Sequence, residues 1–163
     1  HETLRLTAKV INMGKNNVDL TNYVRAHCMY AAAKGMIAHF GGFLSKAING
    51  AAVKRHLNIA RNLAPENPAV YFGYGSYYLL VPNILGRNAN KAIEYLEKAI
   101  AADPQFADAY VRMAQAYKLK GNMDKYDQYL QKALDIDPRN ILAWDIKSGD
   151  CEFICVTERA EAP

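Results

Sequence analysis

The chain has 163 residues, of which 51% are hydrophobic and 22% charged, and its net charge is +4. This length and apolar content are enough for one domain with a real core, which excludes a disordered chain. No apolar run reaches the ~18–20 residues that cross a bilayer, and the first residues lack a signal-peptide pattern. We therefore expect a soluble domain without a transmembrane segment, and the compartment is not predicted.

Basic residues are concentrated in the first part of the chain. Residues 1–65 contain nine Lys or Arg and two acidic residues, whereas residues 66–163 contain eleven and fourteen. The basic residues are scattered and form no block, which favours a solvated face. We expect no nucleic-acid partner.

Recurring prolines divide the chain into similar units. Three six-residue segments begin with Ala and end with Pro65, Pro104 or Pro138. Their sequences are ARNLAP, AIAADP and ALDIDP. Matching helix ends of this kind indicate one structural unit that is used repeatedly.

The least regular units come first. Residues 1–17 predict a partial closing helix that ends near Gly14. Residues 18–67 predict a distorted repeat, with an opening helix within 18–35 and a closing helix over 51–67. The apolar and Gly-containing residues 35–50 are expected to form an enlarged connection between these helices.

Residues 68–104 form a second unit with an enlarged turn. The interval from Pro65 to Pro104 is 39 residues and that from Pro104 to Pro138 is 34, so five residues are inserted within LLVPNILGRNAN. The stretch 79–92 is interpreted as a longer surface turn, with a contact loop as the alternative if its apolar residues are exposed. These residues are Val81, Ile84 and Leu85. Gly73 and Gly75 lie within the predicted opening helix, which favours close helix packing over a phosphate loop.

The unit over residues 105–140 is the most regular. Two apolar stripes with helical spacing flank Gly121-Asn122, which predicts a helix, a tight turn and an antiparallel helix. Residues 141–163 begin another opening helix with Trp144 and are interpreted as a partial or capping segment. The chain therefore predicts an all-α stack of about three repeats with a half-repeat at each end.

Cysteine and histidine positions indicate neither a disulfide framework nor a metal site. The three cysteines, Cys28, Cys151 and Cys155, leave one unpaired and show no C-x-x-C spacing. The four histidines have no i, i+4 pair. We expect reduced cysteines, no metal and no cofactor.

The regular unit resembles a tetratricopeptide repeat. Residues that match the pattern of this family are Tyr110, Met113, Ala114, Tyr117, Gly121, Ala133 and Pro138. The resemblance implies an α-α superhelix, a solenoid of antiparallel helix pairs, that forms a single domain over residues 1–163.

The resemblance also implies a concave surface, lined by the opening helices, that binds a peptide or protein segment. Its groove positions in this chain are Phe72, Ser76, Leu79, Asp108, Val111, Arg112, Gln115 and Lys118. Phe72 and Leu79 would serve as apolar anchors. Arg112, Gln115 and Lys118 would fix the polarity of the bound segment.

Some members of this family hold the terminal carboxylate of a chaperone with a clamp of Lys, Asn and Arg. Arg112 stands at the Arg position of this clamp, but Asp108 replaces the Lys one turn earlier and would repel a carboxylate. Phe72 and Ser76 supply neither Lys nor Asn. Chaperone-tail binding is therefore not expected.

The expected function is a non-enzymatic protein-interaction scaffold, because no catalytic motif occurs. One alternative is a solute-binding or transport-associated protein, since LGRNANKA resembles connections in the bacterial tetratricopeptide component of TRAP-type transporters. That alternative predicts an enclosed apolar pocket. Another is self-assembly through the C-terminal segment, where Trp144, Phe153 and Ile154 follow the last complete unit.

Overall fold

The computed structural model describes residues 2–149 and 152–154, and these residues form eight α-helices, one 3-10 helix and no strand. The elements are α1 (Glu2–Met13), α2 (Leu20–Phe40), α3 (Phe43–Leu63), α4 (Pro68–Leu80), η1 (Asn83–Leu85), α5 (Ala89–Ala102), α6 (Ala107–Leu119), α7 (Met123–Ile136) and α8 (Ile141–Ser148). The predicted all-α class is confirmed. None of these helices is both long and apolar enough to span a bilayer.

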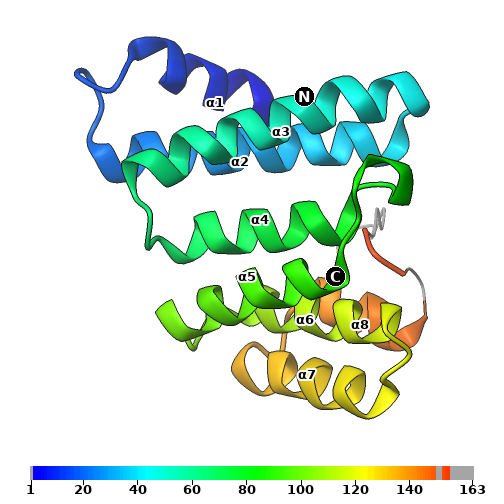
Figure 1. The fold of residues 1–163 in the computed structure, drawn as a ribbon. Helices are drawn as coiled ribbons and strands as arrows, with labels where there is room; N and C mark the ends of the chain where they lie inside the picture. The colour runs from blue at the N-terminus through cyan, green and yellow to red at the C-terminus, as the bar shows by residue number, and fades with distance from the viewer. Residues whose placement is uncertain (1, 150–151, 155–163) are drawn as a thin grey trace, which may run out of the picture.

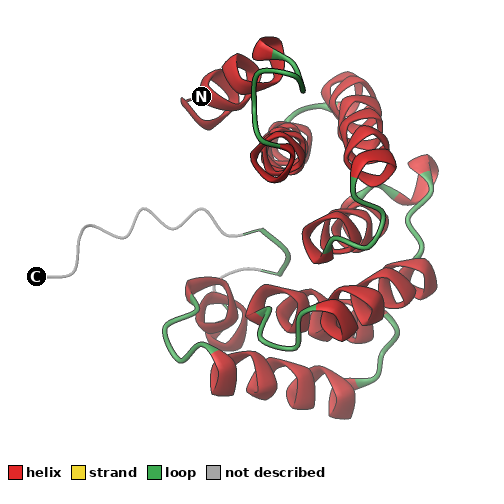
Figure 2. Ribbon diagram, turned by 90° about the vertical axis from the view of Figure 1, so that its left-hand side faces the viewer, coloured by secondary structure: helices red, strands yellow, loops and turns green. Residues whose placement is uncertain are grey.

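Three antiparallel helix pairs, α2–α3, α4–α5 and α6–α7, stack side by side (Figure 1). Helix α1 packs on α2 at one end, and α8 packs on α6 and α7 at the other. Figure 2 shows that the helices follow an arc, so the stack has a concave inner side. This arrangement is the predicted α-α superhelix.

The expected enlarged connection over residues 35–50 is wrong. Helices α2 and α3 each extend over 21 residues, and only Gly41 and Gly42 separate them. Gly35 lies inside α2, where a glycine costs only about 1 kcal/mol relative to alanine, and the packing of two long helices offsets that cost. The tip of this hairpin exposes Phe43 and Leu44 instead of folding them into a loop.

The enlarged turn between α4 and α5 is closed by its own backbone. Asn88 donates its backbone N–H to the Tyr78 carbonyl at 2.9 Å, and its side chain accepts from the Lys91 N–H at 3.0 Å and caps α5. Gly86 has a φ of 101°, which only glycine adopts readily. Val81 is buried, Leu85 is half-buried and Ile84 is 79% exposed, so the turn both packs and presents one apolar side chain.

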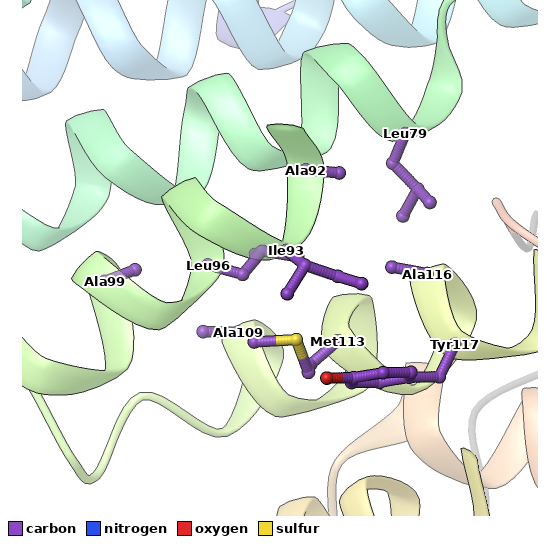
Figure 3. Packing of buried hydrophobic residues seen from close by; sticks show 9 residues of the cluster. All are labelled: Leu79, Ala92, Ile93, Leu96, Ala99, Ala109, Met113, Ala116 and Tyr117. Atoms are coloured by element: carbon purple, nitrogen blue, oxygen red, sulfur yellow. The ribbon is translucent and has the colours of Figure 1, made fainter. Parts of the chain in front are cut away.

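A central cluster of buried residues joins α4, α5 and α6 (Figure 3). Its members, each at most 9% exposed, are Leu79, Ala92, Ile93, Leu96, Ala99, Ala109, Met113, Ala116 and Tyr117. The cluster takes residues from two successive repeats, so neither repeat buries its apolar face alone.

Two histidines meet between α2 and α3. The Nδ1 atoms of His27 and His56 are 2.8 Å apart, so one ring must donate the proton that the other accepts. Burial lowers the pKa of His27. The pKa of His56 falls to about 4, first through burial and then through the charges of His27, Arg55 and Lys34. The folded protein therefore keeps this pair neutral near pH 7.

Acid is expected to destabilise this helix pair. An unfolded histidine binds a proton below about pH 6.5, whereas folded His56 resists protonation until about pH 4, so stability is lost as the pH falls through this window. Because the site is partly hydrated, we expect a loss on the order of 1 kcal/mol between pH 7 and pH 5, measured by urea denaturation. His56→Phe should flatten this dependence, and an unchanged slope would contradict the assignment.

Candidate functional site

Arg112 and Gln115 lie three residues apart on α6, so they share one face of the helix. The Arg112 Nη1 donates to the Gln115 Oε1 at 2.8 Å, which fixes the two side chains relative to each other. Gln115 is fully buried and Arg112 is largely so. The pair forms a fixed set of donors on one face of α6.

The segment 152–154, here called the tail segment, returns to this face of α6. Helix α8 ends at Ser148 and is capped by Gly149, whose φ is 83°. The tail segment lies on the inner side of the arc (Figure 2). The Arg112 Nη1 donates to the Phe153 carbonyl at 2.6 Å. The Gln115 Nε2 donates to the carbonyls of Glu152 at 2.8 Å and Phe153 at 3.1 Å. Two consecutive main-chain carbonyls are therefore held by α6.

The side chain of Phe153 is half-buried and packs against the central cluster. The guanidinium of Arg87 lies 5.8 Å from the centroid of its ring, within the range of a cation–π contact. Arg87 is held in place because its Nε donates to the Val81 carbonyl at 3.0 Å. The enlarged turn thus supplies one wall of the site around Phe153.

Arg112 places a positive charge on this face of α6. Burial lowers the pKa of the Arg112 guanidinium to about 10, and Asp108 opposes that shift, so the side chain is still protonated at neutral pH. The pKa of His39 is lowered by burial and by the charges of Lys46 and Arg112, which places the end of α2 in the same field. An electron-rich ligand such as a peptide carbonyl is favoured here.

The other predicted groove residues have separate environments. Phe72 stacks on Phe106 with ring centroids 4.8 Å apart, Leu79 is buried in the central cluster and the buried Ser76 Oγ has no partner among the described residues. Asp108 accepts from the Asn140 Nδ2 at 2.8 Å, Val111 is buried in a second cluster shared with α7 and α8, and the Lys118 Nζ lies 5.5 Å from the Tyr126 ring. Arg112 and Gln115 are the members of the set with hydrogen bonds to the tail segment among the described residues.

Sequence reasoning missed Arg87 and the carbonyls of Glu152 and Phe153. Arg87 lies in the inserted turn, and the pattern of the repeat assigns no role to an insertion. Phe153 is 41 residues from Arg112, so no local spacing indicates their contact. Cys151 and Cys155, and with them the expectation of reduced cysteines there, lie outside the described residues.

The model of the tetratricopeptide repeat family matches residues 86–148. These residues run from the end of the enlarged turn through α8 and include the unit with the most regular pattern. Residues 86–148 are therefore tetratricopeptide repeats. The earlier helices α2, α3 and α4 continue the stack on its N-terminal side (Figure 1).

A curated relative is similar to part of this chain. Regulator of microtubule dynamics protein 2 from Rattus norvegicus is 33% identical over 76 residues, which is 47% of this chain. The chain covers 16% of the length of that relative, so the match concerns one part of a much longer protein.

Two solved structures have the same fold. One is YrrB, described as a TPR protein with an unusual peptide-binding site, with a TM-score of 0.56 and 22% identity over 77% of this chain and 57% of that chain. The other is MamA, with a TM-score of 0.56 and 20% identity over 90% of this chain and 77% of that chain. At these identities the tetratricopeptide fold is what is shared. The resemblance to the TRAP-associated component stays unconfirmed.

No group of three or more metal-ligating side chains occurs in the part of the chain that is described. Two surface depressions lie away from the contact between α6 and the tail segment. One is formed by α3 residues that include Lys54 and Asn58, and the other lies between α7 and α8 and includes Asp127 and Lys147. Neither contains Arg112 or Gln115.

Proposed function

We propose that this chain is a non-enzymatic scaffold whose concave face, centred on Arg112 and Gln115, binds a peptide segment of another protein. Tetratricopeptide folds are generally interaction scaffolds, and the stacked helix pairs leave an inner face for such a segment. The observation that carries the proposal is that Arg112 and Gln115 already hold two consecutive main-chain carbonyls. Any peptide offers such carbonyls.

The proposed roles follow from the positions of the side chains. Arg112 and Gln115 donate to the main chain of the bound segment, and the central cluster that contains Leu79 provides an apolar floor. Phe72 on α4 extends that floor through its contact with Phe106. The Ser76 Oγ on the same helix has no hydrogen-bond partner among the described residues. Asp108, Val111 and Lys118 shape the groove through their contacts with the following helices.

The partner is expected to present an internal segment and not a free carboxylate. The Asp108 carboxylate lies near enough to Arg112 to raise its pKa, and it would repel a second carboxylate. Neutral carbonyls meet the Arg112 donor without that repulsion.

Arg112→Ala is expected to weaken peptide binding by about 10- to 100-fold, because a hydrogen bond from a charged donor contributes about 1.5–3 kcal/mol. Peptides would first be selected from a displayed random library against the wild-type chain. Isothermal titration calorimetry would then compare wild type with Arg112→Ala, and circular dichroism would verify equal helix content.

Arg139→Ala is the matched control, because Arg139 is exposed in the turn before α8. It should bind the selected peptides like wild type. If the selected peptides bound wild type and Arg112→Ala with equal affinity, that result would contradict the proposed binding site around Arg112.

A further inference from the structure

The tail segment contacts the groove in the way a bound peptide would. Its main-chain carbonyls accept from Arg112 and Gln115, and its one large aromatic side chain, Phe153, rests on the central cluster beneath Arg87. The polar contacts use the backbone of the tail segment and are therefore not specific to its sequence. A segment of another protein with an aromatic residue at the same point could replace it.

The groove is not saturated by the tail segment. The Arg112 Nε is buried without a hydrogen-bond partner among the described residues, and so is the Ser76 Oγ on α4. A buried polar atom without a partner is destabilising, and a ligand that supplied the missing hydrogen-bond partner would remove that cost. The tail segment therefore occupies the site with an incomplete set of contacts.

We propose that the tail segment is an intramolecular occupant of the groove that competes with the partner, and that the partner presents an aromatic residue within an internal peptide segment. This inference rests on the proposed function and adds two features to it. The aromatic side chain enters between the central cluster and Arg87, while the carbonyls of that residue and of the one before it bind Arg112 and Gln115.

The effect of the tail segment on the affinity for an external peptide can be predicted. A segment tethered by a short linker has an effective concentration on the order of 1 mM. If the free segment binds with a dissociation constant of roughly 0.1 mM, the tail segment lowers the apparent affinity of an external peptide by about tenfold. Loosening the tail segment should restore that affinity.

The experiment uses a fluorescein-labelled peptide of residues 150–157 with blocked ends, carrying Cys151→Ser and Cys155→Ser to prevent disulfide formation. Fluorescence anisotropy would measure its binding to the full-length chain and to two variants with a weakened tail. One is Phe153→Ala. The other keeps every contact residue but has about 20 Gly and Ser residues inserted after Gly149, which lowers the effective concentration of the tail.

Both variants are expected to bind the peptide about tenfold more tightly than wild type. Adding Arg112→Ala to Phe153→Ala should then weaken binding at least tenfold, while adding Arg139→Ala should not. A peptide that also carries Phe153→Ala should not bind. The insertion variant retains Phe153, so it keeps the test valid if Phe153→Ala loses helix content.

Equal affinity of wild type and both tail variants would overturn the inference. The library-selected peptides separate this failure from that of the proposed function. The selected peptides could bind in an Arg112-dependent manner while the tail variants leave the affinity unchanged. That result would support the peptide-binding groove and contradict the competition by the tail segment. If no peptide binds any variant, both fall. A concentration-dependent rise in mass by light scattering that Phe153→Ala abolishes would place the tail in a second copy and overturn the intramolecular assignment.

Discussion

Leu57→Ala is expected to lower the free energy of unfolding by about 3 kcal/mol, because a buried leucine leaves a cavity that the helices cannot close. Leu57 is 1% exposed on α3 and belongs to a cluster with Val53, Val70 and Tyr74. It fills the space beside Gly73 on α4, where an added Cβ would come within 2.5 Å of its Cδ2. Thermal unfolding should show a decrease in Tm of roughly 6–12 °C.

Leu44→Ala is the matched control for this prediction, because it removes the same atoms from the same helix. Leu44 is 71% exposed, and its replacement should change the stability by no more than about 0.5 kcal/mol. A comparable loss for both variants would mean that the helix, and not the packing of α3 on α4, determines the effect.

Gly75→Ala is expected to cost about 1–2 kcal/mol, although alanine favours a helix. An added Cβ would lie 2.6 Å from the Leu96 Cγ and 3.3 Å from the Ala92 carbonyl oxygen, so α4 and α5 would have to move apart. Overpacking of this kind lowers the free energy of unfolding by about 1–3 kcal/mol and sometimes more. The higher helix propensity of alanine offsets about 1 kcal/mol of that loss. Urea denaturation with wild type as reference would measure the difference.

Gly50→Ala on α3 is expected to stabilise the protein, whereas Gly75→Ala on α4 is expected to destabilise it. Gly50 lies within α3, and an added Cβ there meets nothing within 4 Å. Its replacement should raise the free energy of unfolding by about 0.5–1 kcal/mol, since only the backbone entropy of the unfolded chain changes. A gain at Gly75 as well would contradict the close approach of α4 and α5.

The regular helices could be predicted because their signals are local. In the unit of α6 and α7, Asn122 accepts from the Lys125 N–H at 3.0 Å and caps α7, and Gly121 takes a φ of 72° in the turn. The periodicity of the apolar residues on each side predicts the buried faces. Gly73 and Gly75 were also correctly interpreted as helix-packing residues, since each faces a leucine of a neighbouring helix.

The connection over residues 35–50 could not be predicted from local signals. Gly35, Gly41 and Gly42 are all consistent with a loop, and apolar residues on either side fit a folded connection equally well. The structure has helix up to Phe40 and again from Phe43. The packing of α2 along α3 determines the length of these two helices, because each additional turn of either helix is stabilised by its contacts with the other.

The sequence by itself determined the repeat, its period and the ends of the regular helices, because caps, turns and apolar spacing act over a few residues. Only the tertiary structure decided what Arg112 meets. Its contact with Phe153 spans 41 residues, and Arg87 reaches the same ring from an inserted turn. Such contacts depend on how the arc curves and where the chain returns after Gly149, and no local spacing encodes either.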